Sequence, residues 1–154
     1  MPALKLLEQH ADRIDKLVLF YPAIYPTATY DKHYVTEVPA VLRPPFAYRQ
    51  NDTIGLLEKF TGKLLVIKGQ YDGLDPSEFG KPPGTAAGQV EIDGHTSYSP
   101  IPKEVIDMVM NAVPNDRRAL LEVAGCDHAM SQWMRNHPRE ADKLVEQVVD
   151  FLRS

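Results

Sequence analysis

Cysteine is nearly absent from this chain of 154 residues, in which Cys126 is the only one. A single thiol cannot form an internal disulfide, so a small secreted fold held together by disulfides is excluded. No C-x-x-C or H-E-x-x-H pattern occurs, and no His/Cys cluster has zinc spacing. The sequence also has no P-loop and no G-x-G-x-x-G after a strand. We therefore expect no metal ion and no nucleotide or flavin cofactor.

Long apolar runs and basic clusters are also missing. No run approaches the ~20 apolar residues that span a bilayer, and no basic stretch followed by an apolar one marks a secretion signal. The net charge is −4, and lysine and arginine are scattered, which argues against nucleic acid and membrane surfaces as partners. These absences favour a cytoplasmic protein with neither nucleic-acid nor membrane partners.

The apolar content is typical of a globular protein, and the length suits one domain over residues 1–154. Thirteen prolines gather mainly in two stretches, which predict two long irregular segments. Outside these segments lie short, continuous apolar runs, which are typical of strands buried on both faces of a parallel sheet. The predicted strands are residues 16–21 (KLVLFY), 63–68 (KLLVIK) and 118–123 (RALLEV).

Apolar residues at helical spacing predict helices between these strands. The predicted helices are residues 3–12, 52–60, 102–112 and 138–152, with a small extra strand at 89–92. Asp52 is the expected cap of the second helix. Leu144, Val148, Phe151 and Leu152 should form the apolar face of the last helix. Strands that alternate with helices predict an α/β fold, with a parallel sheet and right-handed crossovers.

In such sheets, functional side chains lie just beyond the carboxyl ends of the strands. Asp72 follows the second strand, and His128 follows the third. Neighbouring strands lie ~5 Å apart, so the Asp72 carboxylate can reach one imidazole nitrogen and fix the tautomer of the ring. Alone, Asp72 before Gly73 is equally well explained as a turn residue, and His128 as a loop histidine. Their joint placement favours an acid–base pair.

The stretch LLVIKGQYDGLDP resembles the α/β-hydrolase segment that carries the catalytic acid, and LLEVAGCDHA resembles that family's histidine loop. ADRIDKLVLFYPAIYP is similar to the strand that precedes the lid, and EADKLVEQVVDFL to the last helix. The resemblance implies the C-terminal half of an esterase- or lipase-like fold, about three parallel strands flanked by helices. It assigns Asp72 as the acid and His128 as the base, with Asp75 a less favoured acid.

The same resemblance places a nucleophile elbow, G-x-S-x-G, directly before residues 3–12, and this pattern does not occur in the sequence. Ser97 is a poor substitute, because Tyr98 stands where the elbow requires glycine. Cys126 lies two residues from His128, but a packing role is the favoured interpretation. His95 is best explained by a polar surface hairpin. We therefore expect no hydrolytic activity from the chain alone.

Three functional hypotheses stay open: an incomplete hydrolase, one half of a serine hydrolase completed by a second chain, and a non-catalytic binding or assembly module. The tyrosines of residues 21–48 either line a substrate pocket or pack a lid onto the sheet. The strand at 16–21 would lack the neighbour that it has in the complete fold. Because bare apolar strand edges promote association, we expect a homodimer through Leu17, Leu19 and Tyr21.

Overall fold

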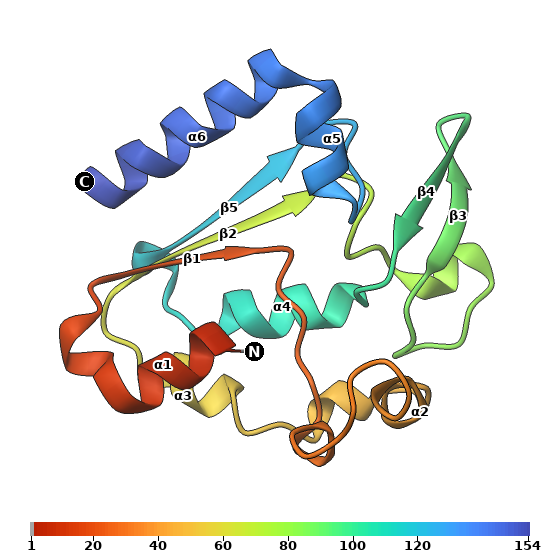
Figure 1. Cartoon of the computed structure of the whole chain (residues 1–154), viewed down its shortest axis with the longest axis horizontal. Helices are drawn as coiled ribbons and strands as arrows, with labels where there is room; N and C mark the ends of the chain where they lie inside the picture. The colour runs from red at the N-terminus through yellow and green to blue at the C-terminus, as the bar shows by residue number, and fades with distance from the viewer. Residues whose placement is uncertain (1) are drawn as a thin grey trace.

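In a computed structural model that describes residues 2–154, with side chains from residue 6 onward, three parallel strands form a central sheet (Figure 1). The strand order is β1-β2-β5, and helices cover both faces. The strands are β1 (Lys16–Phe20), β2 (Lys63–Gly69) and β5 (Arg118–Val123). The sequence-based prediction of an α/β fold with these three parallel strands is confirmed.

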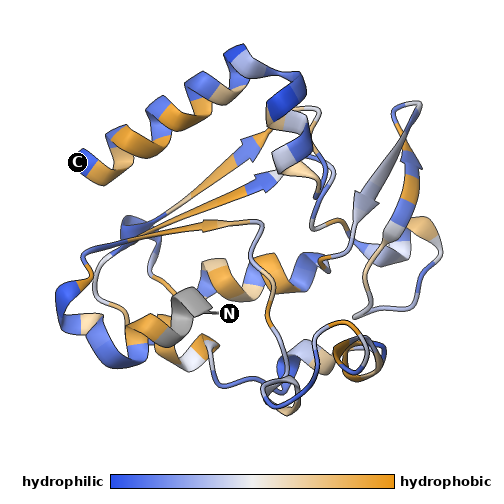
Figure 2. Ribbon diagram, in the orientation of Figure 1, coloured by the Kyte–Doolittle hydropathy of each residue, from blue (hydrophilic) through white to orange (hydrophobic). Residues whose placement is uncertain are grey.

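The middle strand, β2, is buried from Leu64 to Gly69, as its continuous apolar run predicts. Successive side chains of a strand point to opposite faces, so β2 contributes to two separate clusters. Leu64 and Val66 join the cluster on one face of the sheet, and Leu65 and Ile67 join the cluster on the other. Figure 2 shows β1 and β2 as hydrophobic over most of their length.

The first face is covered by α1 (Pro2–His10), α3 (Ile54–Glu58) and α4 (Lys103–Asn111). Each of these helices buries apolar side chains against the sheet, namely Leu7 of α1, Leu57 of α3, and Val105 and Val109 of α4. The predicted helices at 3–12, 52–60 and 102–112 therefore exist, although all three are shorter than predicted.

The second face is covered by α5 (Met130–Asn136) and α6 (Pro138–Arg153). Leu144, Val148 and Phe151 of α6 pack onto the sheet as predicted, but the prediction for Leu152 is wrong, because half of that residue is exposed. The sequence analysis did not predict α5, which is short and places only Met130 fully in the core.

The prediction that residues 118–123 form a fully buried strand is wrong. Only Val123 of β5 is buried, and Leu120 is 45% exposed. β5 pairs with β2 on one side only, so it is an edge strand. Its apolar run resembles that of β2, and apolar content alone does not distinguish a central strand from an edge strand.

Both irregular segments lie beyond the carboxyl ends of the strands (Figure 1). The first contains the short helix α2 (Val38–Leu42), and the second contains an antiparallel hairpin, β3 (Gly88–Ile92) and β4 (His95–Ser99). Single 3₁₀ turns complete the chain at Ala11–Arg13, Thr27–Thr29, Ala47–Arg49, Pro76–Phe79 and Asn115–Arg117. The hairpin confirms the small strand predicted at 89–92 and places His95 in an exposed hairpin, as the sequence suggested.

The predicted cap of the helix near residue 54 is wrong, because the N-cap position is Thr53, whose side chain makes no capping hydrogen bond. The Asn51 side-chain oxygen accepts hydrogen bonds from the backbone N–H groups of Thr53 and Ile54, each at 3.0 Å. Asp52 instead accepts a hydrogen bond from the Tyr30 hydroxyl at 2.5 Å. Both residue types are good caps, so the sequence alone could not choose between neighbours.

Candidate functional site

The turn after β2 presents a fully buried carboxylate. The backbone N–H of Asp72 donates to the carbonyl of Gly69 at 3.1 Å, which closes the turn. The Asp72 carboxylate oxygen Oδ1 accepts a hydrogen bond from the N–H of Gly73 at 2.9 Å. Asp72 is 0% exposed, so its second oxygen, Oδ2, also requires a partner within the protein.

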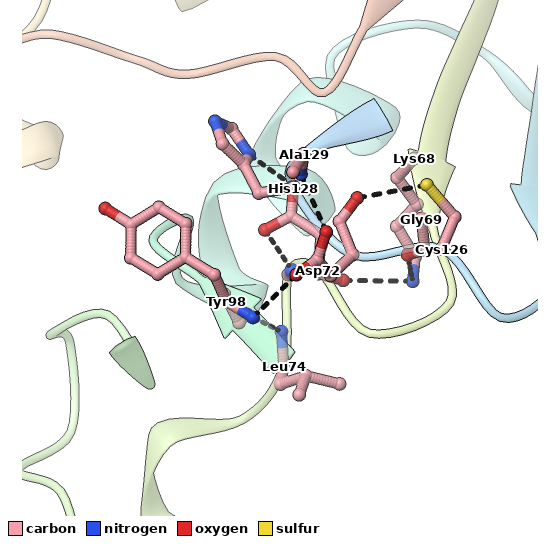
Figure 3. A network of polar contacts seen from close by, with 11 residues as sticks. Lys68, Gly69, Asp72, Leu74, Tyr98, Cys126, His128 and Ala129 are labelled. Carbon is pink, nitrogen blue, oxygen red and sulfur yellow. Dashed lines mark hydrogen bonds and ion pairs between the residues drawn. The ribbon is translucent and has the colours of Figure 1, made fainter. Parts of the chain in front are cut away.

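That partner is His128, in the loop after β5. The distance between His128 Nδ1 and Asp72 Oδ2 is 2.7 Å. An ionised carboxylate can only accept a hydrogen bond, so in this contact Nδ1 carries the proton, and Nε2 is left as the acceptor whenever the ring is neutral. The predicted contact between Asp72 and His128 is confirmed. Figure 3 shows the ring with one nitrogen turned toward Asp72 and the other turned away from it.

A buried lysine is hydrogen-bonded to the turn at residues 69–73 that carries Asp72, here called the acid turn. The Lys68 ammonium donates to the carbonyls of Gly69 and Asp72 at 3.2 and 3.1 Å (Figure 3). It also pairs with Glu122 of β5 at 2.7 Å. Lys68 is 9% exposed. Buried charges are tolerated when they are paired and hydrogen-bonded, so this lysine acts as a brace between the two strand ends.

The carboxylate of Asp127 binds the histidine loop, residues 124–129 between β5 and α5, to the hairpin of β3 and β4. Asp127 Oδ2 accepts from the N–H of Tyr98 at 2.9 Å, and Oδ1 accepts from the N–H of Ala129 at 2.8 Å. The N–H of His128 then donates to the carbonyl of Tyr98 at 3.1 Å. These three bonds secure the backbone on both sides of His128, so the orientation of the imidazole is fixed by strand β4 as well as by Asp72.

Two tyrosines flank the imidazole edge-on. The ring centroids of Tyr21 and Tyr98 lie 5.0 and 6.1 Å from that of His128. Tyr21 has a φ of 34°, a left-handed conformation that is unfavourable for a residue with a side chain. This bend ends β1 and turns the Tyr21 ring toward the histidine. The side chain of His128 stays 25% exposed, and within residues 2–154 its Nε2 has no hydrogen-bond partner.

His128 lines a cavity of about 450 Å³ that opens beyond the strand ends. This volume is within the range of small-molecule pockets. The wall is largely aromatic and aliphatic, and it includes the following residues: Ala23, Ile24, Tyr25, Tyr34, Leu42, Tyr48, Tyr98, Ile101 and Val105. Three of the five tyrosines of residues 21–48 therefore line the cavity, namely Tyr25, Tyr34 and Tyr48. Tyr21 packs against the His128 ring instead.

The other candidate residues lie outside this pair. Asp75 caps the 3₁₀ turn at Pro76–Phe79, where hydrogen bonds from Ser77 lower the pKa of its carboxyl. Ser97 is buried in β4 and, within the described part of the chain, makes no hydrogen bond with His128. His95 is exposed at the start of β4.

Cys126 is fully buried in the cluster beneath α5, and its thiol donates to the carbonyl of Asp127 at 3.2 Å. Burial, with smaller contributions from Asp127 and Asp72, raises the pKa of the thiol to about 12. A thiol in this state forms almost no thiolate near neutral pH, so it is a packing residue and not a nucleophile.

Lys68 and Asp127 also belong to the site, although neither was predicted from the sequence. The position of Lys68 could have indicated its role, because a charged residue near the end of a buried apolar strand must have a partner. Asp127 offered none, because its partners are backbone N–H groups, one of them on a hairpin 29 residues away.

No protein-family model matches the chain, and no curated protein is significantly similar to it in sequence. Among residues 2–154, no group of histidine, cysteine or acidic side chains could hold a metal ion. Over the same residues, no helix combines the length and apolar character needed to cross a membrane.

Proposed function

We propose that this chain is the acid-and-base part of a serine ester hydrolase with the α/β-hydrolase fold, and that another polypeptide segment must supply the nucleophile. The observation that carries the proposal is the contact of 2.7 Å between Asp72 and His128 at adjacent strand ends. A buried carboxylate that orients an imidazole, whose free nitrogen faces a cavity, is the arrangement of a general base in acyl transfer.

The chemistry requires more than this pair. A serine hydroxyl must lie within hydrogen-bond reach of Nε2, and N–H donors must stabilise the oxyanion that forms. The sequence has no G-x-S-x-G; Ser97 and Cys126 are both buried, and the thiol of Cys126 donates to the carbonyl of Asp127. The acid and base of such a site, without a nucleophile, should hydrolyse esters no faster than the solvent does.

The experiment supplies the missing nucleophile. The N-terminal half of an esterase of this fold, ending with its nucleophile elbow, is co-expressed with residues 1–154 and assayed with p-nitrophenyl butyrate. We expect no turnover from the 154-residue chain alone and turnover from the pair. Asp72→Ala and His128→Ala should abolish that turnover, whereas Asp75→Ala, in the same loop, should leave it intact.

Two outcomes would refute this proposal. Turnover by the chain alone that depends on His128 would show that a nucleophile is already present. Turnover by the pair that survives Asp72→Ala and His128→Ala would show that these residues are not the acid and base.

The same proposal accounts for the open edge of β1. A strand of the other half, or of a second copy of this chain, would pair with it. Tyr21 N–H and Asp15 C=O bond to β2, so by alternation the outward-facing backbone groups of β1 belong to Lys16, Val18 and Phe20. The side chains of Leu17 and Leu19 face the apolar cluster on the first face instead. Phe20, which is 41% exposed, is therefore the side chain to test at this edge.

A further inference from the structure

We infer that the cavity beside His128 binds an elongated acyl compound with an apolar body and a carboxylate at the end remote from the reacting carbonyl, and that Arg43 binds this carboxylate. The inference rests on the proposed function only in identifying the cavity as the acyl pocket. The binding itself requires no nucleophile and can be tested without catalysis.

Arg43 is the first observation. It lines the cavity, and within residues 2–154 its guanidinium has neither an ion pair nor a hydrogen bond. The neighbouring Arg49 differs, because Glu104 binds it through two hydrogen bonds at 2.6 and 2.9 Å. A guanidinium is the group best suited to a carboxylate, which it binds through two parallel N–H donors.

The wall of the cavity is the second observation. The residues that line it include no aspartate or glutamate. Several of its hydroxyl groups already have partners, since Tyr25 and Tyr34 contact each other at 3.2 Å and Tyr48 donates to Glu104 at 2.8 Å. The guanidinium of Arg43 is therefore the strong donor left for a ligand, and no acidic group of the wall opposes an anion.

The arrangement of the chain is the third observation. Arg43 follows α2, whereas His128 precedes α5, and the two helices lie well apart across the carboxyl ends of the strands in Figure 1. The wall of the cavity that contains both residues also includes the apolar side chains of Ile24, Leu42 and Ile101. A ligand that reaches both residues must therefore carry its anion at one end and its reacting group at the other. A half-ester of a dicarboxylic acid has this form.

Two probes of the same shape isolate the charge, 4-phenylbutyrate and the neutral 4-phenylbutyramide. Calorimetric titration of the full chain at low salt should give at least tenfold tighter binding for the carboxylate. Arg43→Gln should remove this preference while leaving the affinity for the amide unchanged. Arg139→Gln, an exposed arginine on α6 that is not in the cavity wall, is the matched control and should keep it.

Two further variants locate the ligand. Leu42→Ser should weaken both probes alike, because Leu42 belongs to the apolar wall. His128→Gln should keep the preference for the carboxylate. The inference is overturned if neither probe binds, if the two bind equally, if Arg43→Gln keeps the preference, or if His128→Gln abolishes it. Failure of the esterase assay with these results in place would refute the hydrolase proposal alone.

Discussion

Gly69 stands where the acid turn and the histidine loop meet, and the substitution Gly69→Ala tests how closely they are packed. A methyl group at this position would lie 2.6 Å from the carbonyl oxygen of Asp127, and closer still to that of Cys126. Ordinary contact begins at 3.4 Å, so the Asp127 carbonyl would have to move by about 0.8 Å (from 2.6 to 3.4 Å). Both atoms belong to backbone and cannot rotate away.

The cost follows from this shift. The histidine loop is held by the N–H of Tyr71, which donates to the Cys126 carbonyl at 2.9 Å, and by the bond between His128 and Asp72. Overpacking of this kind destabilises proteins by about 1–3 kcal/mol. We expect urea unfolding of Gly69→Ala to show a loss in this range, together with weakening of the Asp72–His128 hydrogen bond.

Gly55→Ala is the matched control. Gly55 lies in α3, and an added Cβ there would meet nothing within 4 Å. Alanine is the better helix former by roughly 0.5–1 kcal/mol, so this variant should be more stable than the wild type. The same chemical change is thus expected to have opposite signs at the two sites. A Gly69→Ala protein as stable as the wild type would refute the close packing of the two loops.

Three further expectations can be checked separately. If the edge of β1 pairs with a second copy, Phe20→Lys should convert a dimer to a monomer in light scattering, whereas Leu120→Lys on the opposite edge strand should not. A monodisperse wild-type monomer at micromolar concentration would rule the dimer out. The thiol of Cys126 has a raised pKa in the folded chain, so its contribution to stability is complete below pH 9.0 and lost as the pH rises toward about 12; Cys126→Ala should flatten the loss of stability above pH 9.0 in urea titrations. Asn51→Ala should lower the free energy of unfolding by about 1 kcal/mol, since the N–H groups of Thr53 and Ile54 at the start of α3 lose their acceptor, and an unchanged urea midpoint would contradict this role.

The sequence allowed prediction of the strands and of the pair for a physical reason. A strand that packs against apolar clusters on both faces is largely apolar, so KLVLF and KLLVI were identifiable as strands without any structure. The prediction of full burial holds for β2 but is wrong for β1, an edge strand in which only Leu19 is buried. Functional groups collect at the carboxyl ends of such strands, which selected Asp72 and His128 from the many polar residues of the chain.

Other features depend on contacts between distant segments, which periodicity does not encode. The exposure of β5 follows from its position at the sheet edge, although its sequence, RALLEV, resembles that of a central strand. The support of His128 by β4 depends on how a hairpin lies against a loop, and hydrogen bonds to backbone leave no mark on residue type. The helix α2, of five residues within an irregular segment, shows no periodicity long enough to recognise.

Asp72 holds the His128 ring with its proton on Nδ1 and leaves Nε2 free as the acceptor. Proton and nitrogen NMR of histidine-labelled protein at neutral pH tests this directly. We predict an Nδ1–H signal of His128 far downfield of the amides, which disappears in Asp72→Ala and persists in Asp75→Ala. A His128 ring protonated on Nε2 alone, or an Nδ1–H signal that Asp72→Ala leaves unchanged, would show that Asp72 does not hold the ring in this tautomer.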